Sequence, residues 1–162
     1  MIKTIRIFGA SLLMCSATAH VSAHKCDLSS VDEQSADEFV VSYYDRLSKG
    51  VSRDQLRIYL SGEQNKIIDG TILTLATDLN HEFDMEAQRL MDSFGVEAAC
   101  ESLTLKKAKV WGQFTKFGSV SYDIKPKCTE WTNNKARSLN LRYSKTLCEW
   151  VITGVSDEVE YQ

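Results

Sequence analysis

Apolar residues in the first half of the chain recur every three or four positions, which is the spacing of amphipathic helices. Ser35 and Glu38 form an S-x-x-E capping box, and Gly50 stands where a helix C-terminal cap is expected. These signals predict a helix over 36–49. A repeated start signal predicts a short second helix over 53–60. The apolar face of the first helix consists of Phe39, Val40, Tyr43, Tyr44 and Leu47.

The next segment carries a further helical pattern with one interruption. Ser61 is the expected start of a third helix, but Gly70 weakens its middle, and the alternation over 71–75 also fits a strand. Asp84 is the expected cap of a fourth helix, which Gly95 is expected to close. The stripe of the third helix consists of Ile68, Ile72, Leu75 and Leu79.

After Cys100 the apolar period changes from about 3.6 to about 2, the period of β-strands. The alternation predicts four antiparallel strands near 102–111, 117–125, 136–144 and 147–155. Helices first and a strand meander afterwards predict an α+β fold. In this fold the N-terminal helices pack on one face of a four-stranded antiparallel meander sheet.

The N-terminus has the pattern of a secretory signal. Lys3 and Arg6 precede an apolar stretch and then small residues. The stretch is shorter than the about 20 residues that a membrane span needs. We therefore predict a cleaved signal peptide over 1–23, with Ala19 as an alternative cleavage position. Two other interpretations are a buried N-terminal helix and a lipoprotein signal, against which the large Met14 argues.

Charge and size narrow the class of protein further. The 162-residue chain has a formal net charge of −3, and removing the signal peptide makes the remainder more acidic. A mildly acidic balance argues against nucleic acid or an anionic membrane as the main partner. We expect 24–162 to form one domain, without membrane insertion, in a periplasmic or secreted location.

Four cysteines remain after the predicted cleavage, and an even number in an exported chain predicts two disulfides. If the first two strands form a hairpin with its turn near 112–118, Cys100 and Cys128 lie opposite each other. Elimination then pairs Cys26 with Cys148. Because the spacings lack a C-x-x-C pair, we predict no metal site and no cofactor.

The two ends of the domain carry a combined pattern of core positions. These positions are Ala36, Phe39, Leu47, Gly50, Trp150, Ile152 and Val155. An amphipathic helix, further helices and a meander with such a closing strand resemble the NTF2-like superfamily, which includes exported bacterial domains of unknown function. A cystatin-like domain is also similar. The resemblance implies a fold and no particular chemistry, and segment 61–99 is more helical than the superfamily leads us to expect.

Ionisable residues gather most densely around His81. With Glu82 and Asp78 beside it, this histidine is the alternative catalytic group, because a carboxylate orients an imidazole and raises its pKa. Members of the NTF2-like superfamily use Asp/His pairs in a cone-shaped pocket, which the resemblance would extend to these residues. The competing interpretation is a solvated connection between two helices.

Aromatic residues in predicted turns are the candidate binding residues. Trp131 lies in a polar connection, and Trp111 and Phe114 lie near the first hairpin turn with Phe117. Displayed aromatic side chains are frequent hot spots of protein interfaces. We expect two of the three hairpin aromatics to belong to the core.

Two functional hypotheses follow. The first is an exported, disulfide-stabilised, non-enzymatic domain that binds a protein or a small apolar ligand in the hollow between helices and sheet. An immunity-type inhibitor is one form of it. The alternative is an NTF2-like isomerase or hydrolase that uses His81 and nearby carboxylates.

Overall fold

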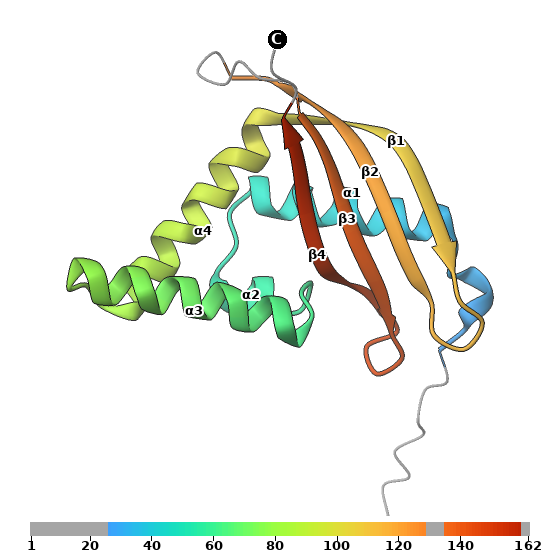
Figure 1. Ribbon diagram of the computed structural model, residues 1–162, viewed down its shortest axis with the longest axis horizontal. Helices are drawn as coiled ribbons and strands as arrows, with labels where there is room; N and C mark the ends of the chain where they lie inside the picture. The colour runs from blue at the N-terminus through green and yellow to red at the C-terminus, as the bar shows by residue number, and fades with distance from the viewer. Residues whose placement is uncertain (1–25, 129–134, 160–162) are drawn as a thin grey trace, which may run out of the picture.

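The computed structural model describes residues 26–128 and 135–159, so the predicted signal peptide over 1–23 lies outside the described residues. Helices precede strands along the chain (Figure 1), which confirms the predicted α+β fold. A short 3-10 helix spans Leu28–Ser30. The main elements are α1 (Glu33–Ser48), α2 (Arg53–Arg57), α3 (Gly62–Leu79), α4 (Phe83–Cys100), β1 (Glu101–Trp111), β2 (Phe117–Pro126), β3 (Lys135–Ser144) and β4 (Glu149–Val159).

The strands form one antiparallel sheet in the order β1-β2-β3-β4, as a meander. Helix α1 runs across one face of this sheet, and α3 and α4 form a hairpin that extends away from it (Figure 1). Alternate residues of the central strands face α1, and their burial forms the core. Its fully buried members on the sheet include Val120, Tyr122, Ile124, Leu139, Leu141 and Ile152.

Helix α1 begins three residues before its predicted start. Asp32, rather than Ser35, is the N-cap, and its side chain accepts a hydrogen bond from the Ser35 amide at 2.9 Å. The Ser35 hydroxyl accepts from the Asp32 amide in return, which completes a capping box. The predicted capping box of Ser35 and Glu38 is therefore wrong. Aspartate caps a helix as well as serine does, and Asp32 stands directly before the first helical residue, Glu33. Gly50 follows the helix end with a φ of 84°, as expected of a terminating glycine.

Helix α2 is shorter than predicted because its last residues pair with the sheet instead. The Ile152 amide donates to the Tyr59 carbonyl and the Ser61 amide donates to the Ile152 carbonyl, both at 2.8 Å. These bonds form a short parallel bridge to β4. Helix α3 then runs through Gly70 without a break, so the strand alternative over 71–75 is wrong.

Both boundary predictions for α4 are also wrong. Asp84 lies inside the first turn, and the N-cap residue is Glu82, whose side chain makes no capping hydrogen bond. Gly95 does not close the helix, which continues to Cys100. Instead, α4 passes close to α1 at this glycine, where an added Cβ would lie 3.1 Å from the Leu47 carbonyl oxygen.

The structure contains the two predicted disulfides. Cys100–Cys128 joins the junction of α4 and β1 to the chain beyond β2, and Cys26–Cys148 fastens the segment before α1 to the β3–β4 turn. Because Cys148 lies in that turn with a φ of 53°, β4 begins at Glu149 rather than at the predicted 147. Two disulfides fit an oxidising environment. In the described part of the chain, the helices are too short or too polar to cross a bilayer.

Candidate functional site

A cavity of about 250 Å³ lies between α1, the start of α3, α4 and the inner face of β3 and β4. Its volume equals the space of about eight water molecules at about 30 Å³ each. Most of its wall is apolar, and a few polar side chains, among them Gln64, Glu97 and Arg137, also line it, a combination that is typical of small-ligand sites. The apolar wall consists of Leu47, Leu60, Ile68, Phe94, Ala98 and Val155.

Two consecutive tyrosines of α1, Tyr43 and Tyr44, line this inner cavity. The Tyr43 ring packs edge-on against Tyr44 and tilted against Tyr59, with centroids 5.3 and 5.6 Å apart. The Tyr43 hydroxyl has no hydrogen-bond partner within 26–128 and 135–159. The only fully buried side-chain atom without a partner in those ranges is Nη1 of Arg53. The Tyr43 hydroxyl is therefore open to the cavity rather than sealed in the core.

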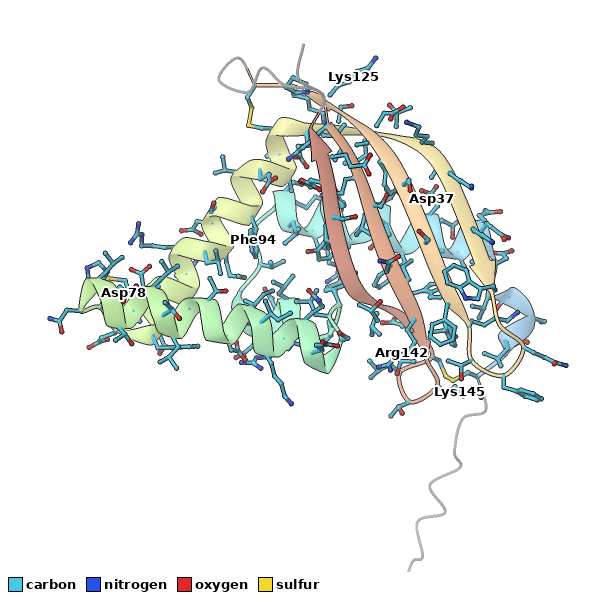
Figure 2. All side chains as sticks on the ribbon, in the orientation of Figure 1. Asp37, Asp78, Phe94, Lys125, Arg142 and Lys145 are labelled. Carbon is cyan, nitrogen blue, oxygen red and sulfur yellow. A yellow bond between two sulfur atoms is a disulfide. The ribbon has the colours of Figure 1, made fainter. Side chains whose placement is uncertain are left out.

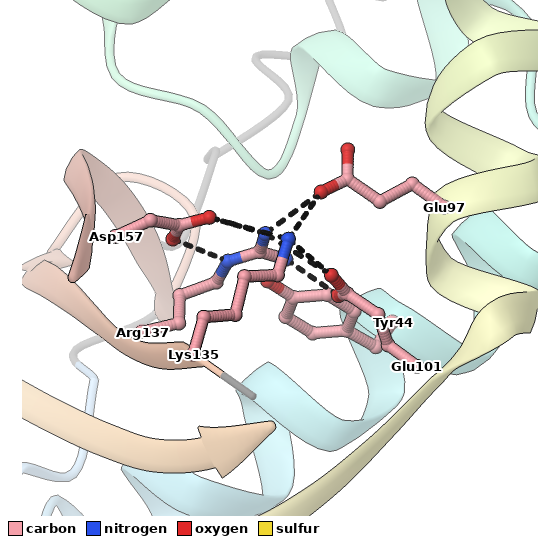
Figure 3. A network of polar contacts seen from close by, with 6 residues as sticks. All are labelled: Tyr44, Glu97, Glu101, Lys135, Arg137 and Asp157. Carbon is pink, nitrogen blue, oxygen red and sulfur yellow. Dashed lines mark hydrogen bonds and ion pairs between the residues drawn. The ribbon is translucent and has the colours of Figure 1, made fainter. Parts of the chain in front are cut away.

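A charged network borders the cavity where α4 meets the sheet (Figure 3). At its centre, Arg137 of β3 is buried, and its Nε donates to Asp157 of β4 at 2.6 Å. Its two terminal nitrogens donate to carboxylates of Glu97 at 2.8 Å and of Glu101 at 2.7 Å. Nη1 also donates to the Tyr44 hydroxyl at 2.8 Å. The guanidinium is thus paired on every side and leaves no free donor for a ligand.

Lys135 adds a second cation to this network. Its Nζ lies 2.8 Å from Glu97 and 2.5 Å from Glu101. Among the described residues, three carboxylates therefore face two cations, which is one negative charge in excess when all are ionised. One oxygen of Glu97 receives the bonds from both cations, and the other points away from them (Figure 3).

Burial and ion pairing shift the pKa values of two carboxyl groups of the network in opposite directions. Burial raises the pKa of Glu101, and the neighbouring Glu97 charge adds to this, against the pull of Lys135 and Arg137. Burial acts in the same direction on Glu97, but hydrogen bonds from Lys135 and Arg137 outweigh it and lower its pKa. Glu101 is therefore the member of the network that is protonated first when the pH falls.

The tyrosine hydroxyls stay protonated at neutral pH. Burial raises the pKa of Tyr44 to about 12, although Arg137 opposes the shift. Burial also raises the pKa of Tyr43. Tyr44 accepts a hydrogen bond from Arg137, and within the described ranges no acceptor for its own proton is found. Both tyrosines can thus donate a hydrogen bond to a ligand oxygen.

The structure does not assemble the predicted catalytic group. The His81 ring contacts Glu86 at 2.6 Å, and its side chain makes no hydrogen bond with Glu82 or Asp78. Asp78 lies at the far end of the α3–α4 hairpin, away from the sheet (Figure 2). Glu86 is buried, and hydrogen bonds from His81 and Arg89 lower its pKa against the effect of burial. This contact ties the helix connection to α4.

The predicted binding aromatics lie on the surface. Trp111 and Phe114 are exposed, and so is Phe117, so the expectation that two of these three belong to the core is wrong. Trp111 and Phe117 instead stack on each other with centroids 6.2 Å apart. Trp131 lies outside the described residues. Trp111, Phe114 and Phe117 do not line the inner cavity.

Comparisons with known proteins leave the site to be interpreted from its own geometry. No family model, curated protein or solved structure matches this chain. The resemblance to the NTF2-like superfamily therefore stays a prediction.

The sequence analysis does not predict the residues of this site to be functional. Arg137 carries the clearest overlooked signal, because it occupies an inward-facing position two residues before Leu139 in an alternating strand. A buried arginine requires anionic partners. Those partners come from α4, the first residue of β1 and β4, which the sequence pattern did not place beside it.

Proposed function

We propose that this protein is an exported, non-enzymatic binding domain that holds a small, mostly apolar ligand in the inner cavity. The observation that supports this most is the pair of tyrosines with hydroxyl protons free to donate, in a wall that is mostly apolar and whose other polar side chains, Gln64, Glu97 and Arg137, already have partners. Polar groups placed this way orient a ligand, while apolar contacts supply most of the affinity.

The charge of the network favours a neutral ligand. A ligand carboxylate would add a fourth negative charge beside Glu97, Glu101 and Asp157, whose cations are already paired. A ligand ammonium would lie next to the Arg137 guanidinium. The two tyrosine donors match an acceptor oxygen, such as a ketone, ester or amide carbonyl. We infer an apolar molecule with one such oxygen.

Calorimetric titration of the disulfide-bonded protein with 2-octanone, octanoate and octylamine tests this inference. We expect 2-octanone to bind more tightly than either charged molecule of the same chain length. Tyr43→Phe removes one donor and should weaken 2-octanone binding about 2- to 12-fold, since a neutral hydrogen bond contributes about 0.5–1.5 kcal/mol.

The matched control is Tyr59→Phe. Tyr59 packs against the Tyr43 ring but does not line the cavity, so its hydroxyl should not affect binding. Equal losses in both variants, or octanoate binding as tight as that of 2-octanone, would contradict the proposal.

A further inference from the structure

Exposed apolar side chains gather at one end of the sheet. The β1–β2 and β3–β4 turns both lie there (Figure 1), and the Tyr143 amide joins them by donating to the Lys116 carbonyl at 2.9 Å. Phe114 at the first turn is 77% exposed, and Leu147 at the second is 53% exposed. With the Trp111–Phe117 stack, these side chains form what we call the hairpin-tip surface.

Basic side chains accompany the hairpin-tip surface. Lys109 lies over the Trp111 ring at 5.9 Å, and Arg142 is the cross-strand partner of Phe117. Arg142 and Lys145 project at this end of the sheet (Figure 2). Neither has a carboxylate partner in the ranges that the structure describes. Acidic side chains also lie near this end. Asp27 and Glu149 act on the pKa of Tyr143, and Glu33 accepts a hydrogen bond from the Val110 amide at 3.0 Å.

The shape of this surface distinguishes between occupants. Its apolar side chains protrude from two separate turns, and neither Phe114 nor Trp111 lines the cavity. A protein partner would need hollows matched to each protruding ring. A lipid interface needs no such match, only apolar and cationic groups at the same end of the molecule. Tryptophan and lysine are well suited to that interface, because each combines an apolar body with a polar tip.

We propose that the hairpin-tip surface makes a peripheral contact with an anionic phospholipid membrane. Phe114, Leu147 and the Trp111 indole enter the headgroup region, and the neighbouring cations bind phosphate groups. The contact leaves the inner cavity open, because the residues that line the cavity and those of the hairpin-tip surface are different. The inference stands independently of the ligand proposed above.

Flotation with lipid vesicles tests this contact on the full disulfide-bonded chain. The protein should float with vesicles of equal parts phosphatidylcholine and phosphatidylglycerol, and much less with phosphatidylcholine alone. Combined Arg142→Glu and Lys145→Glu should lower the affinity about 30-fold or more. The control, Lys66→Glu with Lys125→Glu, makes the same change in net charge on α3 and at the other end of the sheet.

A test variant and a matched control variant also examine the apolar side chains of the hairpin-tip surface. Phe114→Ser should weaken vesicle binding at least tenfold, and Leu73→Ser, at a similarly exposed position on α3, should leave it unchanged. Absence of binding to anionic vesicles overturns the proposal, and so do equal losses in the test and control variants. Binding to polyglutamate without binding to vesicles also overturns it, and would indicate an acidic polypeptide as the partner.

Discussion

At the scale of single residues, the central group is the Arg137 guanidinium. Only 6% of this residue is exposed, and its nitrogens are shared among three carboxylates and the Tyr44 hydroxyl. A charge in such a position is costly unless it is both paired and hydrogen-bonded. The members of the network therefore do not contribute equally to stability. The cost of replacing one of them depends on the charges that remain buried without a partner.

Two substitutions separate these roles. Arg137→Met leaves Glu97, Glu101 and Asp157 with only Lys135, and we expect it to lower the free energy of unfolding by about 3–5 kcal/mol. Glu101→Gln removes one negative charge, from the carboxyl whose pKa burial raises, but it turns an acceptor oxygen into an amide donor that faces Arg137 or Lys135. It should therefore cost less than Arg137→Met, about 1–3 kcal/mol. Urea unfolding at neutral pH measures both. Equal costs would show that charge balance does not govern the network.

At the scale of elements, glycines occupy two different environments within the helices. Gly70 lies in the middle of α3, and a Cβ there would meet nothing within 4 Å. Gly95 lies in α4, where a Cβ would press on the Leu47 carbonyl of α1 at 3.1 Å. The first glycine only weakens its helix, whereas the second permits two helices to approach closely.

Alanine substitutions should therefore have opposite effects. Gly70→Ala should raise the free energy of unfolding by about 0.5–1 kcal/mol, through higher helix propensity. Gly95→Ala gains the same propensity but must separate α1 from α4, so we expect a net loss of stability. Urea unfolding of the two variants under the same conditions checks the signs. A stabilising Gly95→Ala would show that α1 and α4 can move apart without loss.

The sequence predicts the existence of the elements better than it predicts their boundaries. Apolar periodicity located the helices and strands and the change of class at Cys100, because burial on one face imposes that period. Helix boundaries are predicted wrongly where the same residue type can occur in more than one structural role. Gly95 has the sequence signal of a helix end but lies where α4 passes close to α1. Ser35 has the signal of an N-cap but is the partner of the actual N-cap, Asp32.

At the scale of the whole molecule, neither the net charge nor the local sequence pattern indicates the two candidate sites, which are the hairpin-tip surface and the inner cavity. The net charge of −3 argues against an anionic membrane, yet Arg142 and Lys145, which have no carboxylate partner in the described part of the chain, project at one end of the sheet. The inner cavity depends on α4 bringing Glu97 beside Arg137 of β3, a contact over 40 positions of sequence. Local patterns do not encode such contacts, so the sequence predicted a hollow but not its polar side chains.

The disulfides act on the whole chain, and the lengths of their loops distinguish them. Cys26–Cys148 spans 122 positions and Cys100–Cys128 spans 28. In the chain-entropy model, closing these loops in the unfolded state stabilises the fold by about 5 and about 3.5 kcal/mol, respectively. Paired serine substitution at Cys26 and Cys148 should therefore be the more damaging. Urea unfolding of both double variants without reductant measures the difference, and mass analysis after thiol alkylation confirms that the remaining bond is intact. A smaller loss for the longer loop would contradict this expectation, and would mean that the segment before α1 detaches from the turn without its bond, so that the native state also gains entropy.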